Sequence, residues 1–173
     1  MKIGLIYGSD TGYTDQVSNG IKSYFEKFNI TQHEIHLIDK KTILMYDFLI
    51  FGVPTWNIGE LQSDWDYYFE EFKKIDFSGK LIAIFGLGDQ IGYEDNFVDG
   101  IGILAKEIIK NNGKIIGEWS AKDYKFKKSK GLKDENNFYG LAIDEDNQYD
   151  LTEERIKKWC NLIIENEDFK KLK

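Results

Sequence analysis

The sequence predicts an α/β protein built on a doubly wound five-stranded parallel sheet in the order 2-1-3-4-5. Strand-like apolar runs alternate with helix-like segments five times, which indicates parallel strands joined by right-handed crossovers. The run 48–53 is apolar at nearly every position, as in strands covered on both faces. A length of 173 residues and five strands favour this order over the dinucleotide-binding arrangement. In both arrangements ligands bind beyond the carboxyl ends of the strands.

Each element has its own signal. We expect strands at 2–8, 33–38, 48–53 and 80–85, a fifth strand starting at 114–119, and helices at 13–28, 40–46, 61–72, 97–109 and from 152 onward. The helices show apolar residues three and four positions apart, as in Ile156, Trp159 and Ile163. Pro54 is expected to end the third strand, and Thr152 to be the N-cap of the last helix.

Two histidines and one cysteine could in principle take part in chemistry, but we interpret all three as structural residues. His33 and His36 are three positions apart in the expected edge strand, so they point to opposite faces and are predicted to be solvated rather than metal ligands. Cys160 is the only cysteine, which excludes an internal disulfide and a cysteine-based metal cluster. It lies on the apolar face of the last helix and is predicted to be a core residue.

The composition narrows the class of protein. The formal net charge of −7 argues against non-specific nucleic-acid binding and towards a basic partner. The six-residue apolar run near the N-terminus is too short for a signal peptide, and no run approaches the ~18 apolar residues of a membrane span. We therefore expect a monomer in the cytoplasm, with neither nucleic acid nor membrane as a partner.

The turn 9–14, between the first strand and the first helix, is rich in hydroxyl groups. Unpaired backbone N–H groups at a helix N-terminus attract anions, and Ser9, Thr11 and Thr14 add neutral donors. The turn has no Lys or Arg, so the lysine-containing P-loop is absent. This pattern favours one terminal phosphate; an ordinary turn capped by Ser or Thr is the alternative.

Two further loops follow buried strands and carry aromatic residues. Trp56 lies in loop 54–60, and Tyr93 in the glycine-rich loop 86–93. Each ring alone would be interpreted as packing, but with a phosphate turn at the same edge they indicate a flat ring on a phosphorylated tail, the shape of FMN. The glycines of loop 86–93 are spaced GxGxxxG, so we do not interpret them as a dinucleotide fingerprint.

All three loops resemble those of the flavodoxin family. The stretch 9–14 is similar to its phosphate motif, 54–60 followed by Asp64-Trp65 to its tryptophan loop, and 86–90 with Tyr93 to its tyrosine loop. Residues 119–142 resemble the insertion that splits the fifth strand in long-chain flavodoxins, and 141–148 resemble the stretch before their last helix. The resemblance implies a single flavodoxin-like domain over 1–173.

The resemblance also implies a function. Flavodoxins are low-potential electron carriers, not enzymes, and cycle non-covalently bound FMN between semiquinone and hydroquinone. The residues that the resemblance implies for FMN binding are Ser9, Asp10, Thr11, Gly12, Tyr13, Thr14, Pro54, Thr55, Trp56, Asn57, Ile58, Gly59, Leu87, Gly88, Asp89 and Tyr93. By the same resemblance, the Asn57–Ile58 carbonyl would face the protonated flavin N5, with Gly59 easing the turn. No catalytic or metal-binding residue is predicted.

The charges are unevenly distributed. Residues 60–71 and 89–99 carry five and four carboxylates without a basic residue, whereas 122–133 contains six lysines and one Asp. We expect both acidic runs to form a docking rim for basic-faced redox enzymes, such as flavodoxin/ferredoxin-NADP reductase or 2-oxoacid oxidoreductases. The lysines are left with two alternatives: a solvated loop, or a segment that lies beside the acids.

Two other functions use the same fold. An FMN-dependent NAD(P)H or quinone reductase needs open space over the flavin, which two covering aromatic rings would deny. A receiver-type signalling module needs a phosphoacceptor Asp at the end of the third strand, where Pro54-Thr55 follows Val53.

Overall fold

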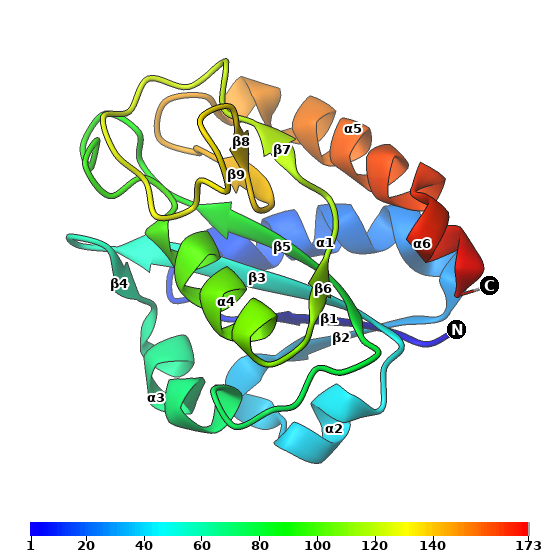
Figure 1. The fold of residues 1–173 in the computed structure, drawn as a ribbon. Coiled ribbons are helices and arrows are strands. Elements are labelled where there is room, and N and C mark those ends of the chain that lie inside the picture. Colours follow the sequence, from blue (N-terminus) through cyan, green and yellow to red (C-terminus); the bar gives the residue numbers. More distant parts are fainter. Residues whose placement is uncertain (173) are drawn as a thin grey trace.

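A parallel sheet forms the middle layer of the computed structural model, which describes residues 1–172 (Figure 1). Its strand order is β2-β1-β3-β5-β6. The strands are β1 (Ile3–Tyr7), β2 (Ile30–Glu34), β3 (Phe48–Trp56), β5 (Leu81–Leu87) and β6 (Lys114–Ile115). With the parallel strands counted in chain order this is 2-1-3-4-5, so the predicted fold class is confirmed.

Helices cover both faces of the sheet (Figure 1). One face carries α1 (Tyr13–Phe25) and α5 (Thr152–Glu165), which α6 (Glu167–Lys171) follows; the other carries α2 (Lys40–Leu44), α3 (Ser63–Phe72) and α4 (Asp99–Lys110). Short 3-10 turns lie at Glu26–Phe28, Ile35–Leu37 and Tyr149–Leu151.

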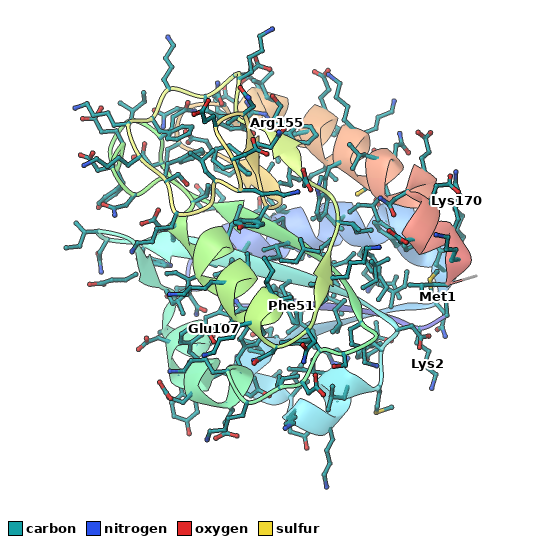
Figure 2. The ribbon with its side chains drawn as sticks, in the orientation of Figure 1. Met1, Lys2, Phe51, Glu107, Arg155 and Lys170 are labelled. Carbon is teal, nitrogen blue, oxygen red and sulfur yellow. The ribbon has the colours of Figure 1, made fainter. Side chains whose placement is uncertain are left out.

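Alternation along the central strands divides the core into two clusters. On β3, Phe48 and Ile50 pack with α1 and α5, while Leu49 and Phe51 pack with α3 and α4. Phe51, labelled near the middle of the molecule in Figure 2, makes edge contacts with the rings of α3 and its neighbours. Burial of each such ring contributes about 1.5–3 kcal/mol, which stabilises the layers that present the loops.

The fifth strand is split. After β6 the chain leaves the sheet, and it returns as β9 (Leu141–Ile143), which also pairs in parallel with β5. Between them β7 (Trp119–Ser120) and β8 (Asn137–Phe138) form a separate antiparallel pair. The interruption between β6 and β9, which we call the insertion, spans 116–140, and Leu141 and Ala142, the last residues of the predicted insertion 119–142, lie in β9.

The insertion packs on the molecule through aromatic rings. Phe97 lies 5.4 to 5.9 Å, centroid to centroid, from the rings of Tyr124, Phe126 and Phe138. Gly102 of α4 allows close approach, because a Cβ there would lie 1.8 Å from the Lys130 carbonyl oxygen. Arg155, at the start of α5 and labelled in Figure 2, places its guanidinium carbon 4.3 Å from the centre of the Tyr124 ring.

The lysines of the insertion lie beside the second acidic run. Lys127 pairs with Glu94, Lys128 with Asp95 at 3.8 Å and Lys130 with Asp99 at 3.6 Å. The alternative that placed the lysines beside the acids is therefore the observed one. Three of the four carboxylates of run 89–99 are therefore paired with lysines, and the docking role expected for this run stays a prediction.

Pro54 does not end the third strand, contrary to expectation. β3 continues to Trp56 and turns back as β4 (Glu60–Leu61), which pairs antiparallel with Thr55 and Trp56. The Gly52 carbonyl accepts from Gly8 on the β1 side, so the nitrogen of Pro54, two residues on, faces that same side. Because β1 has already ended at Tyr7, the missing N–H costs no ladder bond.

The edge strand lies earlier than expected, at 30–34 rather than 33–38. Tyr7, the last residue of β1, pairs with Glu34, so residues beyond Glu34 have no strand to pair with and form a 3-10 turn.

The two histidines differ in their surroundings. His36 is partly solvated and lies near Glu34 and Asp64. His33 is not solvated as expected: it is half-buried, with Nε2 2.5 Å from the Tyr46 hydroxyl.

Thr152 is not the N-cap of the last helix. A 3-10 turn precedes α5, Thr152 already has helical dihedral angles, and its hydroxyl donates to Glu145 instead.

Cys160 is buried in the core as predicted, and burial raises the pKa of its thiol to about 12.

Within residues 1–172 no helix is long and apolar enough to cross a bilayer. The same residues contain no group of three or more His, Cys, Asp or Glu side chains arranged to hold a metal ion.

We predict that His33 makes stability depend on pH. Burial lowers the pKa of His33, so the unfolded chain takes up a proton more readily than the folded chain. Stability is therefore retained above the ordinary pKa of about 6.5 and lost as the pH falls through the lower folded pKa. Thermal unfolding followed by circular dichroism should show a smaller loss of Tm between about pH 7.5 and about pH 5.5 for His33→Gln than for wild type. An equal loss in both proteins would contradict this linkage.

Candidate ligand cleft

The loops after β1, β3, β5 and β9 meet at one edge of the sheet, on the left in Figure 1. They enclose a cleft of about 330 Å³. It is lined by Asp10, Thr11, Tyr13, Thr14, Pro54, Thr55, Trp56, Asn57, Leu87, Gly88, Asp89, Tyr93, Glu145 and Asp146. Four predicted residues, Ser9, Gly12, Ile58 and Gly59, lie in the same loops but do not line the cleft in this conformation. None of the lining residues is Lys or Arg.

The turn 9–14 presents the bare N-terminus of α1. Gly12 occupies the N-cap position with φ 87°, a conformation that glycine tolerates, and no side chain caps the helix. The Gly12 N–H donates to Ser9 Oγ at 3.0 Å, and the Thr14 side chain is buried beside the first turn. The alternative of an ordinary Ser- or Thr-capped turn is therefore not observed, and the first amides of α1 are available for an anion.

Asp10 connects this turn to the start of α3. Its Oδ1 accepts from Gln62 Nε2 at 2.7 Å and from Ser63 Oγ at 3.0 Å. Gln62 is buried, and its Oε1 accepts from the Trp65 N–H at the first turn of α3. The side chain of Asp10 thus fixes the turn to a neighbouring helix.

The β3–β4 hairpin carries Trp56 at the cleft. Its tip takes positive φ at Asn57 (45°) and Gly59 (88°), and Asn57 Nδ2 donates to Glu60 Oε2 at 2.6 Å. Ile58 is 75% exposed at the tip. Gly59 instead faces α4, where a Cβ would lie 2.5 Å from Asp99 Oδ2.

Thr55 has a structural partner. Its Oγ1 accepts from the buried Gly100 N–H at 2.9 Å, which satisfies one of the free donors in the first turn of α4. The hairpin and α4 are thereby held in one register.

The loop after β5 carries Tyr93, whose side chain is 47% exposed. Asp89 folds this loop: its Oδ1 accepts from the N–H groups of Ile91 and Gly92 at 2.9 and 2.7 Å. Burial raises the pKa of Asp89, but the hydrogen bonds from Gly92, Asn147 and Ile91 outweigh burial, so the pKa lies below its usual range. Asp89 therefore remains a carboxylate beside the cleft.

Sequence reasoning missed one wall of the cleft. Glu145 and Asp146 follow β9, and they line the cleft because β9 lies beside β5. Burial and the negative charges of Asp89 and Asp144 raise the pKa of Asp146. The available signal was the position of 144–146 directly after a short apolar run, Leu141 to Ile143, which is the returning half of the split strand.

Together the loops place unpaired helix amides, neutral hydroxyls and two aromatic side chains around one cleft without a basic residue. The fold and this cleft define a doubly wound α/β protein with a ligand site beyond the carboxyl ends of its strands. The model of the family Flavodoxin matches residues 5–159. The chain belongs to the flavodoxin family, and its length fits the long-chain type, so the predicted family is confirmed.

The relatives support this assignment across nearly the whole chain. A flavodoxin from Nostoc sp. is 51% identical over 158 residues, covering 91% of this chain and 92% of the relative. Flavodoxin 1 of Escherichia coli is 43% identical over 162 residues, covering 94% and 92%. The Fusobacterium nucleatum flavodoxin, solved with flavin mononucleotide bound, aligns with a TM-score of 0.87 at 29% identity, covering 92% of this chain and 95% of that one.

We predict that Thr55→Val destabilises the protein by about 1–3 kcal/mol, because the buried Gly100 N–H would lose the hydroxyl that accepts from it while the side-chain shape is kept. Urea unfolding measures the change. Thr31→Val, at an exposed position on β2, is the matched control and should change stability by less than about 0.5 kcal/mol. Equal effects of the two substitutions would show that the Thr55 hydroxyl does not support α4.

Proposed function

We propose that this flavodoxin carries electrons at low potential on one non-covalently bound FMN, as an electron carrier and not an enzyme. The observation that supports it is the uncapped start of α1 at the end of a cleft lined by Trp56 and Tyr93. The solved F. nucleatum flavodoxin, whose length is close to that of this chain, binds flavin mononucleotide. The residues predicted for FMN binding lie in the loops around this cleft or at the adjoining ends of β3, β5 and α1.

The turn 9–14 would hold the phosphate. The first backbone amides of α1 carry the positive end of the helix dipole, and Thr11 and Thr14 contribute hydroxyl donors. Because no cationic side chain neutralises the phosphate there, its negative charge would add to the negative potential within the cleft.

The other two loops would hold the ring. FMN supplies one-electron redox chemistry when it is bound. Trp56 and Tyr93 exclude water from its faces, and the Asn57–Ile58 peptide, at the strained tip of the hairpin, offers backbone groups to its edge. Carboxylates of Asp89, Glu145 and Asp146 line the same cleft. In a poorly solvated site these negative charges disfavour further negative charge, which lowers the reduction potential.

FMN should bind the apoprotein about 100-fold or more tightly than riboflavin, because riboflavin lacks the phosphate and with it several hydrogen bonds to a charged group worth roughly 1.5–3 kcal/mol each. Titration followed by flavin fluorescence measures both affinities. Thr14→Val should weaken FMN and leave riboflavin unchanged, while Thr31→Val should change neither. Similar affinities of wild type for FMN and riboflavin would refute the phosphate site.

We also infer that residues 1–173 form one flavodoxin-like domain with the long-chain insertion within it, and that the protein acts as a monomer in the cytoplasm. Both core clusters share a single sheet, which supports one domain. The single free cysteine suits a reducing compartment.

The partners we propose are redox enzymes with a basic face, such as flavodoxin/ferredoxin-NADP reductase or 2-oxoacid oxidoreductases. The free acids of run 60–71 support this more than those of run 89–99. Glu70 and Glu71 pair with Lys73 and Lys74. Asp66 has no cationic partner among the described residues, and Glu60 accepts only from Asn57 at the cleft.

Removal of free rim charge should slow electron transfer. We expect Glu60→Gln/Asp66→Asn to reduce the rate of reduction by such a reductase at about 0.01 M salt, where the Debye length is about 30 Å, and to match wild type near 1 M, where it is about 3 Å. Stopped-flow absorbance measures the rate. The control Glu94→Gln/Asp95→Asn changes net charge equally but removes acids that lysines already partner, and should slow the reaction less. If the control is slower, docking takes place on the insertion side.

A further inference from the structure

The loop that carries Tyr93 is closed on itself but weakly held by its own side chains. The Tyr93 N–H donates to the Asp89 carbonyl at 3.0 Å, and the Asp89 carboxylate accepts from the amides of Ile91 and Gly92. Ile91 and Tyr93 are 55% and 47% exposed. Packing of these side chains therefore does not fix where the loop lies relative to the sheet.

Gln90 is the buried side chain of this loop, at 2% exposure. Its Nε2 and its backbone N–H both donate to Asp144 Oδ2, at 2.7 and 3.1 Å. Asp144 is fully buried and directly follows β9. Hydrogen bonds in such surroundings are strong, and removal of one partner leaves the other unsatisfied. The pair thus ties the Tyr93 loop to the end of the neighbouring strand.

The same carboxylate shapes the neighbouring wall of the cleft, which is the turn after β9. Asp144 Oδ1 accepts from the N–H groups of Asp146 and Asn147 at 3.1 and 3.0 Å. Asn147 Nδ2 reaches across to Asp89 Oδ1 at 2.8 Å. One buried acid therefore orders both turns that flank this side of the cleft.

The insertion contacts the loop on both sides of Tyr93. The Lys125 N–H donates to Gln90 Oε1, before Tyr93. The N–H groups of Lys127 and Lys128 donate to the Glu94 carbonyl at 2.7 and 3.0 Å, directly after it. Backbone N–H groups of the insertion thus bind the loop both before and after Tyr93. Gln90 accepts the first of these hydrogen bonds and also donates to Asp144.

We propose that Gln90 and Asp144 are positioning residues that hold the Tyr93 ring against the flavin. The inference rests on the proposed function, in which FMN occupies the cleft. A loop already ordered in the free protein loses less conformational freedom on binding, so the pair raises affinity for the ring without contacting it. Because the effect passes through Tyr93, it disappears when that ring is absent.

A double-mutant cycle tests this. Gln90→Met keeps the length of the side chain and removes its hydrogen bonds. We expect it to weaken FMN binding about 10-fold in the wild-type background and less than about 2-fold in a Tyr93→Ala background. Riboflavin should lose affinity by the same factor as FMN, since the effect concerns the ring, and flavin fluorescence of the Gln90→Met holoprotein should rise towards that of Tyr93→Ala.

Gln148→Met is the matched control. Gln148 bonds to the Asp123 carbonyl and to Arg155, so it also joins the insertion to the turn after β9 but does not touch the Tyr93 loop. It should leave the FMN Kd unchanged. If Gln90→Met does not fold, Asp144→Asn, which keeps the side-chain size, should show the same loss confined to the background that contains Tyr93.

The outcomes separate the two proposals. Equal losses with and without Tyr93, a loss for FMN but not riboflavin, or no loss at all would overturn the positioning role while FMN binding by wild type stands. Failure of the wild-type apoprotein to bind FMN would overturn both.

Discussion

The pairing of β5 with strands on both of its sides is the constraint on which the cleft depends. β3 lies along one side, and the two halves of the split strand, β6 and β9, share the other. Because all of these strands run parallel to β5, their carboxyl ends reach the same edge, and loops far apart in the sequence meet there. Trp56, Tyr93 and Asp146 come from three such loops. The insertion can leave and rejoin the sheet without disturbing this edge because β9 resumes the pairing.

Charge is arranged around this edge in two ways. Inside the cleft, carboxylates stand without a basic lining residue, and burial together with the negative charges of Asp89 and Asp144 raises the pKa of Asp146. Lys130 pairs with the buried Asp99, and on the adjoining surface Lys127 and Lys128 pair with Glu94 and Asp95. Exposed pairs of this kind contribute little stability each. These pairs instead affect the surface potential: they reduce the negative charge on the insertion side, so the hairpin side is the more negative of the two.

Predictions from local sequence were wrong where contacts with a neighbouring strand or side chain determine the backbone conformation. Pro54 is a sound strand terminator in isolation, yet its nitrogen faces the place where β1 has already ended. Thr152 has the right chemistry for an N-cap, but the preceding residues form a 3-10 turn and its hydroxyl binds Glu145. The edge strand is placed by pairing with β1 rather than by its own weak alternation.

The sequence by itself determined the fold class, the family and the three loops, because buried strands, helical spacing and the hydroxyl-rich turn are properties of contiguous residues. Its predicted residues include every lining residue from the first three loops. Only the tertiary structure decided the fourth wall, Glu145 and Asp146, and the partners of the insertion lysines. It also brought Gln90 against Asp144, 54 residues apart in the chain. Contacts of this kind depend on which strands lie side by side. Because the fifth strand is split, the half that lies beside the carboxyl end of β5 is far from the first half in the sequence, and consecutive residues do not reveal the pairing.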